Sequence, residues 1–152
     1  NNFFKNLDTI INYSKKKNVK LLVENNVISR KNYDYYNKDI FLMTEPDECL
    51  KVLKKFEGDL WLLMDVGHFK VSSNTLNFRK KNILKLNNYI KGYHLSDNNG
   101  LIDSNNIFTS RAWFWKYLIK NLDYYVIEVY KKDLKIILNC LKILNIKINN
   151  AT

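Results

Sequence analysis

The chain has 152 residues, of which 46% are hydrophobic, and this is enough to build the core of one ordinary domain. The sequence contains nothing close to the roughly 20 consecutive apolar residues of a membrane span, so we expect no membrane partner. The formal net charge is +10, but lysine and asparagine are abundant along the whole chain, and arginine occurs only at Arg30, Arg79 and Arg111. The composition therefore argues against nucleic acid as a partner.

The N-terminal part of the chain predicts a helix, a strand and a long loop. Residues 1–5 lack the apolar core and cleavage site of a signal peptide, which favours a cytoplasmic protein. Apolar residues recur at helical spacing over residues 6–17, and residues 19–23 form a short apolar run typical of a strand. Residues 25–39 are polar and rich in tyrosine, without a clear period, and we expect a loop there.

The central part begins with the helix-start signal Thr44-Glu-Pro-Asp47. A capping hydroxyl precedes acidic residues, and proline is tolerated in a first helical turn because its missing donor is not needed there. This helix should end at Gly58. Residues 59–64 predict a second strand, residues 69–77 a polar loop and residues 78–87 a short helix.

The C-terminal part predicts two more strands and two more helices. Residues 90–95 predict the third strand, and Asp97-Asn-Asn-Gly100 predicts a turn because Asn-Gly favours positive φ. We expect a helix over residues 110–121, whose aromatic side chains are interpreted as core rather than as a platform for stacking bases. A strand over residues 123–129 and a final helix over residues 133–144 complete the chain.

The two cysteines, Cys49 and Cys140, fall in predicted helices and lack CxxC spacing. A reduced pair, rather than a disulfide, is the expected state.

Strands that alternate with helices predict parallel βαβ units and an α/β fold. Each predicted strand has an acid or a histidine at or near its C-terminal end: Glu24, Asp65, His94 and Glu128. In α/β barrels, catalytic groups occupy the C-terminal ends of the strands and the loops that follow them. Taken singly, each of these residues is more often a solvated or structural group, but four such placements together indicate a functional site.

Three carboxylates and one imidazole that converge would repel one another strongly unless a cation balanced them. A mixed oxygen and nitrogen site suits Mn²⁺, Mg²⁺, Co²⁺ or Zn²⁺ and disfavours metals that prefer thiolates. We therefore expect one divalent metal ion, whose identity the residues leave open.

The segments LLVEN, MDVGH, YHLSDN and VIEVY, which contain these four residues, resemble the xylose isomerase-like TIM-barrel superfamily. That superfamily includes sugar phosphate isomerases and epimerases, inosose dehydratases and DNA-repair enzymes of the endonuclease IV type (AP endonuclease family 2). The resemblance covers essentially the whole chain. It implies that residues 1–152 form a single partial domain, the C-terminal four or so βα units of an eight-stranded (β/α) TIM barrel.

The resemblance also implies a role for each residue. Glu24, Asp65, His94 and Glu128 would bind the metal, and His68 would contact substrate hydroxyl groups. Glu24 and Glu128 would act as the catalytic acid and base, transferring a proton through a metal-stabilised enediolate. The implied function is a divalent-metal-dependent isomerase or epimerase of a small-molecule sugar or sugar phosphate. We also expect Asp97 to bind a substrate hydroxyl or to orient a loop at the rim of the site.

The chain departs from the family pattern after the third strand. Where members often carry a D-x-H pair that binds further metals in the endonuclease branch, this chain has Asp103-Ser-Asn105. Asparagine is a poor zinc ligand beside imidazole, so the departure favours one metal over a three-metal DNA-repair enzyme. That endonuclease remains the alternative, together with a non-catalytic half-barrel remnant. Because a barrel needs about 250 residues, we expect either a missing N-terminal half or association of two copies.

Overall fold

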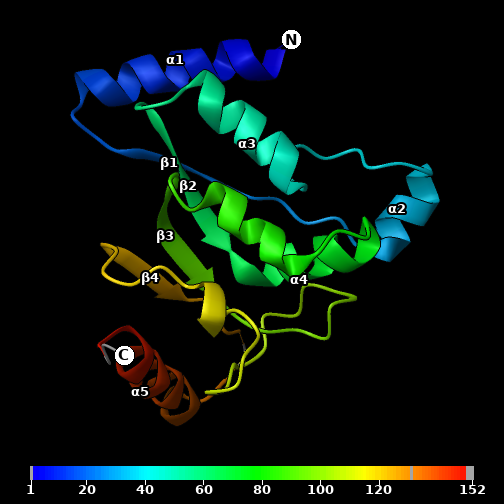
Figure 1. Ribbon diagram of the computed structural model, residues 1–152, viewed down its shortest axis with the longest axis vertical. Helices are drawn as coiled ribbons and strands as arrows, with labels where there is room; N and C mark the ends of the chain where they lie inside the picture. Colours follow the sequence, from blue (N-terminus) through cyan, green and yellow to red (C-terminus); the bar gives the residue numbers. More distant parts are fainter. Residues whose placement is uncertain (1, 131, 150–152) are drawn as a thin grey trace.

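The computed structural model describes residues 2–130 and 132–149, in which helices alternate with parallel strands (Figure 1). In chain order the elements are α1 (Asn2–Lys16), β1 (Leu21–Glu24), α2 (Arg30–Tyr36), α3 (Pro46–Lys55), β2 (Leu60–Asp65), α4 (Val66–Thr75), the 3-10 helix η1 (Lys80–Leu86), β3 (Ile90–Leu95), the 3-10 helix η2 (Trp115–Tyr117), β4 (Tyr124–Ile127) and α5 (Leu134–Asn149). In Figure 1, α1 and α3 lie at the top and α5 at the bottom, with the sheet between them.

The four strands form one sheet in the order β1-β2-β3-β4, and every neighbouring pair is parallel. In this register Glu24 lies beside Leu63, Asp65 beside His94, and Leu95 beside Ile127. The prediction of an α/β fold is confirmed. Because all four strands run the same way, their C-terminal ends meet along a single edge of the sheet.

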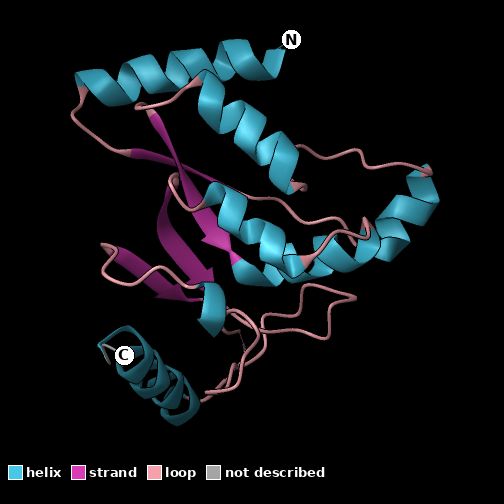
Figure 2. Ribbon diagram, viewed as in Figure 1, coloured by secondary structure: helices cyan, strands magenta, loops and turns pink. Residues whose placement is uncertain are grey.

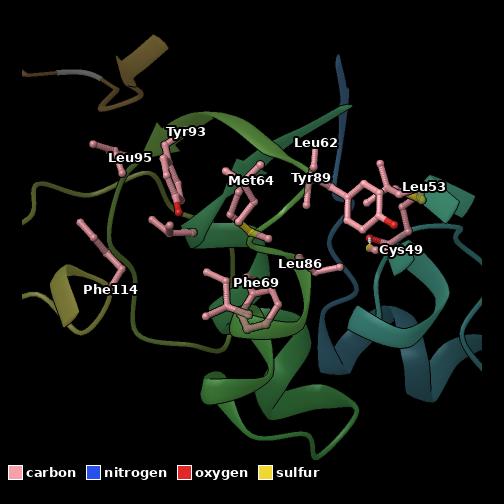
Figure 3. Close-up of a cluster of buried hydrophobic side chains, with 14 of the residues drawn as sticks. Cys49, Leu53, Leu62, Met64, Phe69, Leu86, Tyr89, Tyr93, Leu95 and Phe114 are labelled. Atoms are coloured by element: carbon pink, nitrogen blue, oxygen red, sulfur yellow. Dashed lines mark hydrogen bonds between the residues drawn. The ribbon is translucent and has the colours of Figure 1, made fainter. Parts of the chain in front are cut away.

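One face of the sheet is packed under helices and forms the core. Along β2, Leu60, Leu62 and Met64 are fully buried, whereas the residues between them are only partly covered. Figure 3 shows Met64 and Tyr93, from neighbouring strands, and Phe69 of α4 in one cluster of buried side chains. This period of two, with one set of side chains buried, fixes the register, because a slip of one residue would expose the core set.

The other face of the sheet carries apolar side chains that remain accessible. Tyr124 is 52% exposed and Val126 47% exposed. Together with Leu22, Leu63 and other residues, they line an open hollow of about 510 Å³. All-parallel sheets are usually covered on both faces. If the chain is half of a barrel, as expected from the sequence, the other half would cover this apolar face.

Two segments predicted as loops are helices. Residues 30–36, inside the predicted loop 25–39, form α2, and Ser29 caps this helix by accepting a hydrogen bond from the Asn32 amide. Most of the predicted loop 69–77 belongs to α4. The second error has a clear cause, because α4 buries hydroxyl residues such as Ser72 and Ser73 along with its apolar ones. Its buried face therefore does not stand out from the sequence as an apolar stripe.

The predicted helix over residues 110–121 is wrong, since only η2 is helical there and the rest consists of turns and loop. Phe114 is 1% exposed, and the Trp115 indole donates a hydrogen bond to the Thr109 carbonyl at 2.7 Å. Packing of large aromatic side chains, rather than helical periodicity, therefore shapes this segment. Their interpretation as core residues is confirmed, since Phe114 belongs to the buried cluster and Trp113 packs against it.

The structure also bears on the state of the two cysteines and on the expectation of no membrane partner. Cys49 and Cys140 are both buried and free, in agreement with a reduced pair. Across residues 2–130 and 132–149, no helix has the length and apolar character needed to span a bilayer. Figure 2 shows a long loop between α2 and α3 and a second long connection, which contains η2, between β3 and β4.

Replacing Leu62 by alanine should lower the free energy of unfolding by about 2–5 kcal/mol, because the side chain is fully buried and its removal leaves a cavity. Urea denaturation followed by tryptophan fluorescence measures this loss. Leu84→Ala is the matched control, because Leu84 is 51% exposed and should change stability by no more than about 0.5 kcal/mol. Equal losses in the two variants would contradict the assignment of the core face.

Candidate metal centre

The structure brings together the four residues predicted to bind a metal. Glu24 ends β1, Asp65 ends β2, His94 lies one residue before the end of β3, and Glu128 directly follows β4. Each residue offers one ligand atom, and these four atoms all lie within 4.8 Å of one another. The cluster of Glu, Asp and His side chains could hold a metal ion.

Asp65 is the most deeply buried member of the cluster. Its side chain is fully buried, and Oδ1 caps α4 by accepting a hydrogen bond from the His68 amide at 2.8 Å. The Asn25 side chain clamps the Asp65 main chain, accepting from its N–H at 2.7 Å and donating to its carbonyl at 3.0 Å. Burial raises the pKa of the Asp65 carboxyl to about 7. A nearby cation would offset this cost, since it stabilises the ionised form.

The imidazole of His94 lies among the three carboxylates. Its Nδ1 atom is 2.8 Å from Oε1 of Glu24, 2.9 Å from Oε2 of Glu128 and 3.9 Å from Oδ2 of Asp65. The hydrogen bond with Glu24 raises the pKa of His94 and lowers the pKa of Glu24. A single Nδ1 proton can point at only one oxygen, so Oε2 of Glu128 is close to the ring and yet has no hydrogen bond.

Three carboxylate oxygens of this region are buried without a hydrogen-bond partner: Oδ2 of Asp65, Oε2 of Glu128 and Oδ1 of Asp103. A buried acceptor without a donor is costly, and more so when it is charged. Two of these oxygens belong to the four-residue cluster, and a divalent ion would satisfy both. Three carboxylates with one imidazole form a hard, mixed donor set that suits Mg²⁺, Mn²⁺, Co²⁺ or Zn²⁺. The residues present therefore fit a divalent metal.

His68 lies next to the cluster but is bound by other partners. Its Nδ1 is 2.8 Å from the Asn25 carbonyl, and its Nε2 is 3.2 Å from Oδ2 of Asp103. Burial opposes a charge on this ring, but the hydrogen bond with Asp103 helps to outweigh it, and the pKa of His68 is raised to about 9. The predicted contact between His68 and a substrate hydroxyl stays a prediction.

Asp103 contacts His68 beside the cluster, and the sequence did not predict this contact. It lies in the long loop between β3 and β4, and its neighbours in the sequence carry no local signal for a functional group. The sequence drew attention to it only as the first residue of a motif that departs from the family pattern. Its contact with His68 depends on how the loop folds back, which is a tertiary feature.

Asp97, predicted to bind substrate, is not part of the four-residue cluster. Its Oδ1 accepts hydrogen bonds from Lys70 at 2.6 Å and from the Asn98 amide at 2.8 Å. Its main chain pairs with Asn106, with hydrogen bonds of 2.9 and 2.7 Å. These contacts fit the second role expected for Asp97, that of orienting a loop at the rim, while binding of a substrate hydroxyl stays a prediction.

No family model matches the chain, and no curated protein matches it. Among solved structures, the chain is similar to TTHB071 protein from Thermus thermophilus, in a crystal soaked with ZnCl₂. The two share 20% sequence identity with a TM-score of 0.63, over 96% of this chain and 52% of that one. At this identity the likeness shows the fold alone. The chain spans about half the length of that neighbour.

Replacing Asp65 by asparagine should weaken Mn²⁺ binding by at least about tenfold, because it removes a charged ligand while keeping an oxygen that can cap α4. Isothermal titration calorimetry on the full chain measures the affinity. Asp97→Asn is the matched control, because it removes the same charge from a carboxylate bound to Lys70 outside the cluster. If both variants bind Mn²⁺ as the unaltered chain does, Asp65 is not a ligand.

Proposed function

We propose that the chain is the C-terminal half of a TIM barrel of the xylose isomerase-like type. We further propose that it carries the metal site of a divalent-metal-dependent isomerase or epimerase acting on a small sugar or sugar phosphate. One observation carries the proposal: three carboxylates and an imidazole, delivered by the ends of four successive parallel strands, have ligand atoms within 4.8 Å of one another.

The half-barrel part of the proposal has two supports. The sheet is parallel throughout, and one of its faces exposes apolar side chains such as Tyr124 and Val126, as the inner face of an opened barrel would. In addition, nearly the whole chain matches about half of TTHB071 protein. On this proposal a further set of βα units, from a second copy or from an N-terminal half, closes the barrel.

A small-molecule substrate fits the surroundings of the cluster. A hollow of about 370 Å³ opens beside Glu24 and His68, with Val23 and Leu42 among its apolar residues. This volume is within the usual range of pockets for small ligands. The bound ion would supply Lewis-acid polarisation of neighbouring substrate oxygens. Zinc, the ion in which the TTHB071 crystal was soaked, is among those that suit this donor set.

The chain's own residues supply the proton transfer. Glu24 and Glu128 reach the cluster from β1 and β4, the two edge strands of the sheet. On this proposal one of them removes a proton from a substrate carbon next to a carbonyl, and the other returns it, which is general acid–base catalysis. The Tyr130 hydroxyl donates a hydrogen bond to Oε1 of Glu128 and so helps to orient that carboxylate. Asp65, fully buried and clamped by Asn25, would fix the position of the ion.

Glu24→Gln and Glu128→Gln should each abolish exchange of a carbon-bound substrate hydrogen with solvent in the whole protein, since each removes one of the two proton carriers. Incorporation of deuterium from D₂O into the substrate, monitored by proton NMR for a panel of sugars and sugar phosphates, measures this step. Glu57→Gln is a suitable control, because Glu57 lies outside the cluster, where it accepts a hydrogen bond from the Tyr89 hydroxyl. This variant should leave the exchange unchanged. Full turnover by either test variant would contradict the two-base mechanism.

The metal content separates this proposal from the two alternatives. We expect one divalent ion per chain after dialysis and elemental analysis, because only one cluster of four ligand atoms occurs among the described residues. A multi-zinc endonuclease would need further ligands, yet Oδ1 of Asn105 accepts a hydrogen bond from Ser96. Two or three ions with cleavage of abasic DNA would favour the endonuclease. A folded chain that binds no metal would favour a non-catalytic remnant.

A further inference from the structure

A basic part of the surface lies apart from the metal cluster. Residues 66–96 and 104–122 contain no aspartate or glutamate, although lysine and arginine recur in both segments. The two segments meet where η1 contacts η2. The fold therefore brings together positive side chains from two separate stretches of the sequence, and neither stretch contributes an acid to balance them.

A hollow of about 430 Å³ opens on this basic surface. Its lining includes three successive cations and two aromatic rings, namely Arg79, Lys80, Lys81, Phe78 and Tyr117. The last turn of α4 forms another part of the wall. The metal cluster lies at the opposite end of this helix, whose ten residues span about 15 Å. The hollow is therefore separate from the metal cluster.

The three cations of the hollow have no carboxylate partners. In the part of the chain that the structure describes, no aspartate or glutamate forms an ion pair with Arg79, Lys80 or Lys81. By contrast, Lys85, in the same 3-10 helix, binds Asp47 at 2.7 Å. Unpaired cations around a concave surface attract a ligand of opposite charge.

Lys80 is the cation on which this crowding acts most clearly. It is partly buried, and its ammonium group lies over the Trp113 ring, 5.5 Å from the centroid. Burial lowers the pKa of Lys80, and the positive charges of Lys70 and Lys116 lower it further. Lys70 is itself bound to Asp97, so this carboxylate is already engaged. An anion bound in the hollow would offset the crowding, because it stabilises the charged form of Lys80.

The hollow suits a phosphate group on a small ligand. Arg79 is exposed and can donate two parallel hydrogen bonds to neighbouring phosphate oxygens. Three adjacent cations match a group with a charge of about −2 better than they match a singly charged carboxylate. The volume falls within the usual range for small-molecule sites, and Phe78 and Tyr117 offer apolar rings to the rest of the ligand.

We propose that this hollow binds the phosphate group of a small ligand, with Arg79 donating to two phosphate oxygens and with Lys80 and Lys81 supplying further positive charge. The site is separate from the metal cluster and does not depend on the proposed reaction.

The chain has three tryptophans, so the ¹⁵N-labelled full chain gives three indole N–H signals, which Trp61→Phe and Trp113→Phe samples assign. Sodium phosphate, titrated with EDTA present and at constant ionic strength, should shift the Trp113 signal because Lys80 lies over that ring. The Trp61 signal is the internal control, since Lys91 lies over that ring at 4.5 Å but outside the hollow. No shift of the Trp113 signal, or equal shifts of both signals, would overturn the proposal.

Arg79→Gln should weaken phosphate binding by about tenfold or more, because it removes charged hydrogen bonds to the ligand. Lys81→Gln should also weaken it. Lys142→Gln is the control matched to Lys81→Gln, because Lys142 is exposed on α5 outside the hollow and should leave the affinity unchanged. Equal losses in all three variants would mean that phosphate responds only to net charge, and this would overturn the proposal.

These results can be read even if one variant fails to fold. The comparison of the Trp113 and Trp61 signals uses the unaltered chain as its test sample. Lys81→Gln and Lys142→Gln then decide without Arg79→Gln, since both replace exposed lysines.

Phenyl phosphate separates the two sources of a phosphate group. Tighter binding of phenyl phosphate than of inorganic phosphate would support a phosphate monoester whose organic part contacts Phe78 and Tyr117. Equal affinities would support free phosphate as the ligand. A short DNA oligonucleotide that binds more tightly than both, with the same loss in Arg79→Gln, would overturn the assignment to a small ligand.

Discussion

Electrostatic repulsion among the carboxylates of Glu24, Asp65 and Glu128 is the constraint on which the site depends. Their ligand atoms, together with that of His94, lie within 4.8 Å of one another, and Asp65 is fully buried. Charges this close in a partly dry environment repel strongly, so the arrangement requires positive charge among them. The His68 imidazole, whose pKa is raised to about 9, supplies some of it, and the unpaired oxygens of Asp65 and Glu128 leave room for a divalent ion to supply more.

The fold produces this convergence in a simple way. Four parallel strands with one buried face must end along one edge, and each carries its polar residue at that end. Asn25 then fixes Asp65 through two hydrogen bonds to its main chain, and Asp65 in turn caps α4. Gly67 allows α4 to start this close to the end of β3, since a Cβ atom there would come within 2.6 Å of the Ser96 hydroxyl. The same few residues thus define both the helix start and the position of Asp65 in the four-residue cluster.

Sequence reasoning was successful where a short-range pattern carries the information. The strand predicted over residues 90–95 is β3 with its observed bounds, and the polar residues at strand ends predicted the four-residue cluster. It failed where packing overrides periodicity, as in α4, whose buried face includes serines, and in residues 110–121, where aromatic packing replaces a helix. Asp103 could not be placed beside His68 because that contact depends on the path of a long loop.

The central claim is that the four strand ends form a binding site for one divalent ion. Crystals of the full chain soaked in MnCl₂, with anomalous diffraction measured near the manganese edge, test it most directly. We expect one anomalous peak, from an ion bound to oxygens of Glu24, Asp65 and Glu128 and to a ring nitrogen of His94. Crystals that show no peak there, or manganese bound only elsewhere on the chain, would contradict it.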